Sequence, residues 1–147
     1  YLSPLGNALR LQGRLDDARG VLELAVEHLP DDAEAWNNLG MVHALQGDDT
    51  PAERAYQKAL AINPRMAEAW NNRANLETDD ARKVEYYLKA VASKPDLAPA
   101  WAKLSAVYVR QKNYPKAWAC IRRCQELDYE LDPAYVKKVR ELLRATD

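Results

Sequence analysis

The 147-residue sequence has few of the residues from which catalytic and metal centres are usually built. Its two histidines, His28 and His43, lie far apart, and Cys120 and Cys124 do not have CxxC spacing. A zinc site would need two further ligands. No Ser/His/Asp or Cys/His arrangement and no glycine-rich phosphate loop is present. We therefore expect no enzymatic activity, no catalytic residues, no metal and no cofactor. Both cysteines should be small buried hydrophobic side chains.

Long hydrophobic runs are absent as well. No stretch approaches the roughly 20 apolar residues of a membrane-spanning helix, and the start, YLSPLGNALRLQG, lacks a charged segment followed by an apolar block. Free thiols favour a reducing compartment. We expect a cytoplasmic protein that does not insert into a membrane. Because the sequence begins with Tyr1 rather than Met, we expect it to be a fragment without the targeting signals of its parent protein.

The net charge is only -1, so neither sign dominates the sequence as a whole. Residues 1–80 nevertheless hold 7 Lys/Arg against 14 Asp/Glu, which gives -7, and residues 81–147 hold 14 against 8, which gives +6. The simplest interpretation is two sets of solvated charges, screened beyond about 8 Å at physiological salt. No continuous basic stripe is present, and we expect no nucleic acid partner.

What the sequence does contain is an internal repeat. Trp36 and Trp70 are 34 residues apart, and a further shift of 31 leads to Trp101. The same shifts align columns of small, bulky and small residues: Gly6, Gly40, Ala74 and Ser105; Leu22, Tyr56, Tyr87 and Ile121; and Ala25, Ala59, Ala90 and Cys124. Helices that cross closely need a small residue at the contact and a bulky neighbour beside it, so these columns predict packed helices.

The spacing within one unit is helical, and a turn, QGDDT, divides it into two helices. The first helix has packing residues at i, i+3, i+4 and i+7, which share one face. In the turn, Gly47 should end the first helix, and Thr50 should cap the second in a T-x-x-E capping box with Glu53. The packing residues of the unit are Trp36, Leu39, Gly40 and His43 in the first helix and Ala52, Tyr56, Ala59 and Leu60 in the second.

Together with Gly47 and Pro64, these residues resemble the motif of the tetratricopeptide repeat. The resemblance extends over four units, 1–32, 33–66, 67–97 and 98–131. It implies an all-α fold, a right-handed superhelical solenoid of four tandem helix-turn-helix units over residues 1–132. Residues 133–147 resemble the capping helix that closes such arrays, because one of its faces is apolar and the other charged.

The third unit departs from the pattern. It is three residues shorter than the unit before it, and it places Arg73, Glu77 and Lys83 in packing columns. We expect its first helix to be shorter by about one turn and its packing to be looser.

In the tetratricopeptide repeat family, the first helices of the units line a concave groove that binds extended peptides or single helices. At 100° per residue, the residues opposite the packing face can be selected by counting. Asparagine is a mediocre helix former, but its amide both donates and accepts, so it can pair with a peptide backbone. We expect Asn38 and Asn72 to point most directly into the groove. The selected groove residues are Asn7, Asn38, Met41, Leu45, Asn72, Asn75, Lys103 and Arg110.

The other selected residues suit side chains of a ligand. Met41 and Leu45 would add an adaptable apolar strip, and Lys103 and Arg110 would meet a carboxylate or a phosphorylated side chain. The alternative for the amides and the cations is ordinary solvated surface. The function implied by the resemblance is a protein-protein interaction module, an adaptor or scaffold that binds a peptide or helical segment of a partner. The alternative is a structural self-assembly element that stacks through its repeat ends.

Overall fold

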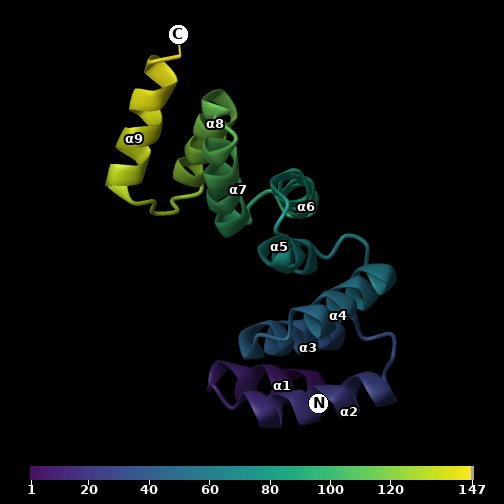
Figure 1. Ribbon diagram of the computed structural model, residues 1–147. Helices are drawn as coiled ribbons and strands as arrows, with labels where there is room; N and C mark the ends of the chain where they lie inside the picture. Colours follow the sequence, from purple (N-terminus) through teal and green to yellow (C-terminus); the bar gives the residue numbers. More distant parts are fainter. Residues whose placement is uncertain (147) are drawn as a thin grey trace. The chain divides into compact units, whose positions relative to one another are not determined.

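The computed structural model describes residues 1–146, and within them the chain forms nine α-helices and no strand. Figure 1 shows them along the chain. The helices are α1 (Leu2–Leu11), α2 (Leu15–His28), α3 (Ala33–Gln46), α4 (Asp49–Ile62), α5 (Ala67–Leu76), α6 (Asp80–Ser93), α7 (Ala98–Arg110), α8 (Tyr114–Glu126) and α9 (Pro133–Arg144).

The chain divides into two compact units. The N-terminal unit, Tyr1–Leu76, holds α1 to α5, and the C-terminal unit, which begins at Glu77, holds α6 to α9. The division falls inside the third predicted repeat, because α5 and α6 belong to different units. As expected, α5 is short, with 10 residues against 14 in α3.

The columns of small and bulky residues are direct contacts in the N-terminal unit. A Cβ atom on Gly40 would lie 2.6 Å from Cε1 of Tyr56, so only glycine lets α3 and α4 approach this closely. Tyr56 is 2% exposed. The repeated tryptophans also contact prolines that recur with the same 34-residue spacing. The indole N–H of Trp36 donates to the carbonyl oxygen of Pro30 at 2.8 Å. Trp70 repeats this bond with Pro64 at 2.9 Å. The sequence period therefore records both packing and hydrogen bonding.

The turn between α3 and α4 is partly as predicted. Gly47 ends α3 in the left-handed region, with φ 83°. The predicted capping by Thr50 is wrong, because the amide of Asp48 already bonds the carbonyl of His43 and α4 begins directly afterwards at Asp49. Thr50 therefore lies inside the first turn. The carboxylate of Glu53 accepts hydrogen bonds from Gln57 and Arg73 instead of closing a capping box.

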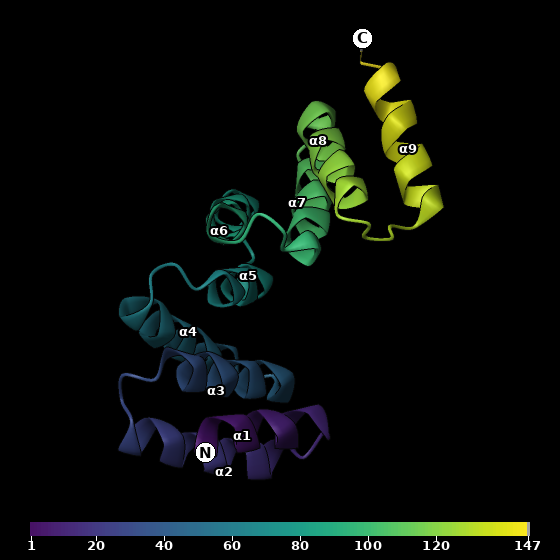
Figure 2. The ribbon, with the colours of Figure 1, turned by 180° about the vertical axis from the view of Figure 1, so that it is seen from behind.

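In the C-terminal unit, α9 lies beside α8 (Figures 1 and 2). The carboxylate of Asp132 accepts from the amide of Ala134 at the start of α9, and Val139 is fully buried. The opposite face is solvent-exposed. Its exposed residues are Lys137, Lys138, Glu141 and Arg144, whereas the guanidinium of Arg140 lies 5.1 Å from the centre of the Trp118 ring on α8.

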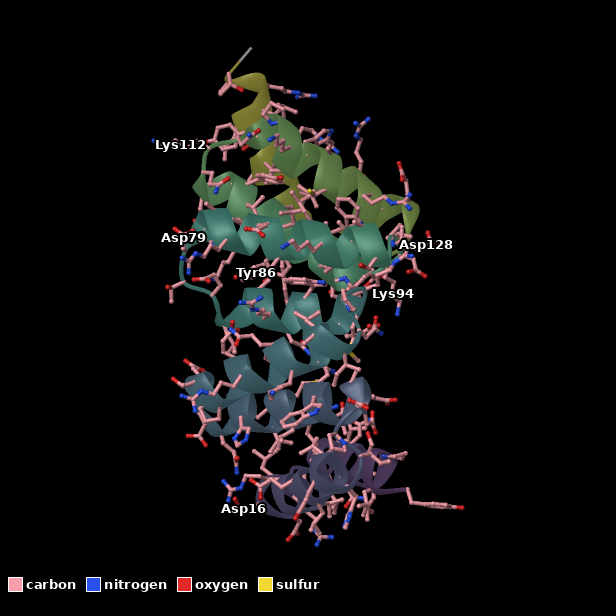
Figure 3. The ribbon with its side chains drawn as sticks, turned by 90° about the vertical axis from the view of Figure 1, so that its right-hand side faces the viewer. Asp16, Asp79, Tyr86, Lys94, Lys112 and Asp128 are labelled. Carbon is pink, nitrogen blue, oxygen red and sulfur yellow. The ribbon has the colours of Figure 1, made fainter. Side chains whose placement is uncertain are left out.

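Two turns in the C-terminal unit use left-handed residues other than glycine. Lys112 and Asp128 have φ of 57° and 52°, and Figure 3 shows them at the two ends of α8. Cys120 and Cys124 on α8 are free and are 3% and 0% exposed, which confirms that they act as buried hydrophobic side chains. Burial raises the pKa of the Cys120 thiol to about 12, so this thiol is unreactive at neutral pH.

Within residues 1–146, none of the helices combines the length and the apolar composition that crossing a membrane requires.

Candidate functional site

A pocket of about 170 Å³ lies between α3 and α5 in the N-terminal unit, and we call it the asparagine pocket. Four of the selected groove residues line it, which means that the structure brings together side chains from two successive repeats. Arg10 reaches it from α1 and Tyr56 from α4. The complete lining is Arg10, Met41, Ala44, Leu45, Tyr56, Asn72, Asn75 and Leu76.

One wall of the asparagine pocket is apolar and comes from α3. Met41, Ala44 and Leu45 follow one another at i, i+3 and i+4, so they share one helix face. Leu45 is 58% exposed, and Met41 is half-buried. The thioether of Met41 is 3.8 Å from Nδ2 of Asn37, a weak hydrogen bond from within the same helix. The wall thus joins a flexible methionine to a leucine that has apolar surface to lose on binding.

The opposite wall comes from α5 and carries the amides. Nδ2 of Asn72 donates to Oδ1 of Asn37 at 3.1 Å, and this bond joins two neighbouring repeats. Asn37 is only 4% exposed, whereas Asn72 is half-buried and Asn75 is exposed. The bond to Asn37 fixes the orientation of the Asn72 amide while using one of its N–H groups. Its second N–H and its oxygen have no other partner among residues 1–146.

Asn38 corrects the prediction for the groove. Its side chain is 5% exposed, and its Nδ2 has no hydrogen-bond partner in the described part of the chain. The prediction that Asn38 points into an open groove is wrong, because counting 100° per residue places a side chain only relative to its own helix. Neighbouring helices decide what covers it, and α3 packs against α1, α2, α4 and α5. Asn37, not Asn38, forms the amide pair with Asn72.

The other predicted residue on α1, Asn7, acts through its neighbour. Oδ1 of Asn7 accepts from Nε and Nη2 of Arg10 at 3.2 and 2.8 Å. Asn7 is half-buried and does not line the pocket. It orients the guanidinium of Arg10, which does line it. Arg10 was not among the predicted residues, although its position three residues after Asn7 places it on the same helix face.

The remaining two predicted residues lie on α7 in the C-terminal unit, and both are exposed. Arg110 donates to the Asp80 carboxylate through Nη2 at 2.6 Å and Nε at 3.1 Å. This hydrogen-bonded pair holds the pKa of Asp80 below its ordinary value and raises that of Arg110. An anionic ligand would therefore compete with Asp80 for Arg110. Lys103 lies on the same helix.

Sequence reasoning missed Ala44, Tyr56 and Leu76 in addition to Arg10. Tyr56 was assigned to a packing column, which it does occupy, but it reaches the pocket as well. Burial raises its pKa, so its hydroxyl stays protonated. Among the pocket lining residues, Arg10 is therefore the charged one at neutral pH, and the lining contains no carboxylate, histidine or cysteine.

Comparison with known proteins finds a family match for part of the chain. Residues 1–65 match the model of the tetratricopeptide repeat. This match covers less than half of the chain, and over it the sequence is similar to the tetratricopeptide repeat. Members of this family generally act as protein-interaction and scaffold modules. The predicted all-α tetratricopeptide fold is confirmed, while its division into four units and a cap remains a prediction.

Among curated proteins, the chain is similar to the mouse protein O-mannosyl-transferase TMTC1, with 38% identity over 80 residues. That stretch is 54% of this chain, which spans only 8% of the length of the mouse protein. Among solved structures, it is similar to one reported in a functional characterization of Pseudomonas aeruginosa pilF, with a TM-score of 0.84 and 22% identity. That match covers 99% of this chain and 67% of the other. The MamA protein gives a TM-score of 0.73 and 19% identity over 86% of this chain and 71% of its own. At these identities the structural likenesses show the tetratricopeptide fold alone.

Proposed function

We propose that the chain is an adaptor or scaffold module that binds an extended peptide segment of a partner protein. One apolar side chain of that segment enters the asparagine pocket. The observation that carries this proposal is the pocket itself, in which an exposed apolar wall on α3 faces two amides on α5. Its volume of about 170 Å³ is below the ~300 Å³ at which pockets for small molecules begin, and suits a single side chain.

The polar groups of the pocket suit the backbone of the same peptide. Asn72 is held in place by Asn37, so it can offer an N–H and an oxygen without losing much side-chain freedom on binding. Asn75 adds a second amide one turn later. Arg10, held by Asn7, offers N–H donors to a peptide carbonyl or to an acidic side chain. Together these groups recognise an extended backbone in a way that tolerates many sequences.

The same lining supports a protein ligand rather than a nucleic acid, and binding rather than catalysis. Arg10 is the single cation of the pocket, and the exposed carboxylates of Glu34 and Glu68 lie on the helices that form it. A phosphate backbone needs a row of cations. The pocket also lacks a pair of groups that could exchange a proton with a substrate. We propose that this segment is non-catalytic and acts in the cytoplasm.

The test uses two leucines of the N-terminal unit that are similarly exposed. Peptides are selected from a random display library against the intact chain, and their affinities are measured for the variants Leu45→Ser and Leu24→Ser. Leu45 lines the pocket and is 58% exposed, while Leu24 on α2 is 48% exposed and lies outside it. We expect selected peptides to share a large apolar residue and to lose about tenfold in affinity with Leu45→Ser alone. Equal affinity for both variants would remove the role of the pocket.

Self-assembly through the repeat ends is the second candidate, and one observation favours it. Leu5 on α1 is 49% exposed, whereas Leu39, its equivalent 34 residues later, is 5% exposed. The face that α3 buries is thus open on α1, and an apolar face of this kind is a typical contact surface between proteins.

A further inference from the structure

A second pocket of the N-terminal unit, with a volume of about 320 Å³, shares no residue with the asparagine pocket. We call it the α4 pocket. Trp36 and Leu39 of α3 and Pro51 and Ala55 of α4 form its apolar part. The indole N–H of Trp36 already donates to Pro30, so the ring offers apolar surface and no free donor. These residues provide a site for one large apolar side chain.

Two cations, Arg54 and Lys58, also line the α4 pocket. They are one turn apart on α4, and both are exposed. Neither forms an ion pair with another residue of the part of the chain that the structure describes, although Arg73 nearby pairs with Glu53 at 2.7 Å. Like charges at this spacing repel each other and disfavour the helix. An anionic ligand would relieve that repulsion, which makes the cation pair a source of binding energy.

His43 completes the lining of this pocket, and its hydrogen bonding is incomplete. Its Nδ1 atom is buried without a hydrogen-bond partner in residues 1–146. The carboxylate of Asp48 lies 3.9 Å away, beyond hydrogen-bond range. The residues around the pocket thus leave this ring nitrogen without a hydrogen bond.

We propose that the α4 pocket is a second binding site, specific for an acidic peptide segment with one large apolar residue. The apolar side chain packs on Trp36 and Ala55, and carboxylates on both sides of it pair with Arg54 and Lys58. Two cations one helical turn apart are better matched by two carboxylates on a chain than by the single carboxylate of a small molecule. This site is separate from the asparagine pocket, so the chain can hold two segments at once.

The test is an NMR titration of the intact chain with three capped peptides. The first is Asp-Glu-Phe-Glu-Asp, the second replaces its acids by the corresponding amides, and the third replaces its phenylalanine by alanine. We expect the first to bind best and to shift the indole signal of Trp36 and the amides of α4. The second peptide measures the contribution of charge, and the third measures that of the apolar side chain, without any change to the protein.

Protein variants then locate the site. Arg54→Gln with Lys58→Gln should lower the affinity for the acidic peptide about fivefold to tenfold, because two partly exposed charge contacts are lost. The matched control is Lys137→Gln with Lys138→Gln, which removes two exposed charges from α9 and should change nothing. Leu45→Ser should also leave this affinity unchanged, which separates the site from the asparagine pocket. Equal binding of the amide peptide, equal loss in the control, or no shift in α4 would each overturn the proposal.

Discussion

At the scale of single residues, the two asparagines of α3 show how a one-position difference separates structural from recognition roles. Asn37 is buried and accepts a hydrogen bond from Asn72, and Asn38 is buried with an unpaired Nδ2. Neither presents an open amide to a ligand. Asn72 has both a structural and a recognition role, since it donates a hydrogen bond to Asn37 and lines the pocket. Its substitution should therefore change stability as well as binding.

Asn72→Ala should lower the free energy of unfolding by about 1 to 2 kcal/mol relative to Asn71→Ala, because it leaves the buried oxygen of Asn37 without its donor. Asn71 is the matched control. It precedes Asn72 on α5, has the same helix propensity, and has a buried Oδ1 without a hydrogen bond among the described residues, so truncating it removes no pairing. Urea unfolding of both variants measures the difference. Equal stability would show that the Asn37 and Asn72 pair contributes nothing.

At the scale of helices, the sequence predicts which residues share a face but not what covers that face. The helix pairs and their turns could be predicted from the sequence, because tryptophan, glycine, alanine and proline recur where the contacts recur. The hydrogen bond from Trp36 to Pro30 is an example. The apolar wall of Met41 and Leu45 could also be predicted, since both residues lie on one face of one helix. A count along one helix is sufficient for such features.

Contacts between side chains of different helices could not be predicted in this way. Arg10 reaches the pocket only because α1, α3 and α5 come together, and no count along α1 contains that information. Arg110 was predicted as a free cation for a ligand, but it pairs with Asp80, 30 residues earlier. Such pairs depend on the register of two helices and on the lengths of two side chains, and only the packed structure determines them.

The pair between α6 and α7 gives a prediction for pH. Arg110→Gln should return the pKa of Asp80 toward its ordinary value, because the hydrogen bond from Arg110 is the largest cause of its lowering. Since the folded pKa is the lowered one, the pair stabilises the fold above the ordinary pKa of aspartate, and this contribution is lost as pH falls through the lowered pKa. Carbon-13 NMR of the Asp80 carboxyl measures the shift directly.

The control for this pair is Arg122→Gln, which removes one exposed charge from α8 without touching Asp80. It should leave the Asp80 pKa where it is. Unfolding in urea should show a loss of stability for Arg110→Gln at neutral pH and no difference from the unsubstituted chain in strong acid. A pKa of Asp80 that does not move in Arg110→Gln would contradict the assigned cause.

At the scale of the whole molecule, α1 and α9 differ in the surface that each exposes. The outer face of α9 carries Lys137, Lys138 and Arg144, all exposed. The open face of α1 is apolar and includes Leu5. An apolar face and a charged face do not complement each other, so contact of α1 with α9 of the next copy is disfavoured. The alternative is a contact between the α1 helices of two copies. Such a contact uses the same face on both copies, so it forms a closed dimer.

Sedimentation velocity over a wide range of concentration should therefore show no species larger than two chains. Any dimer should disappear in Leu5→Lys, because this change places a charge in the apolar face and repels its copy across a twofold axis. Leu24→Lys, a similarly exposed leucine on α2, is the comparison for a nonspecific effect of charge. Oligomers that grow steadily with concentration would instead require contact between unlike ends. They would favour stacking through both repeat ends over a closed pair of chains.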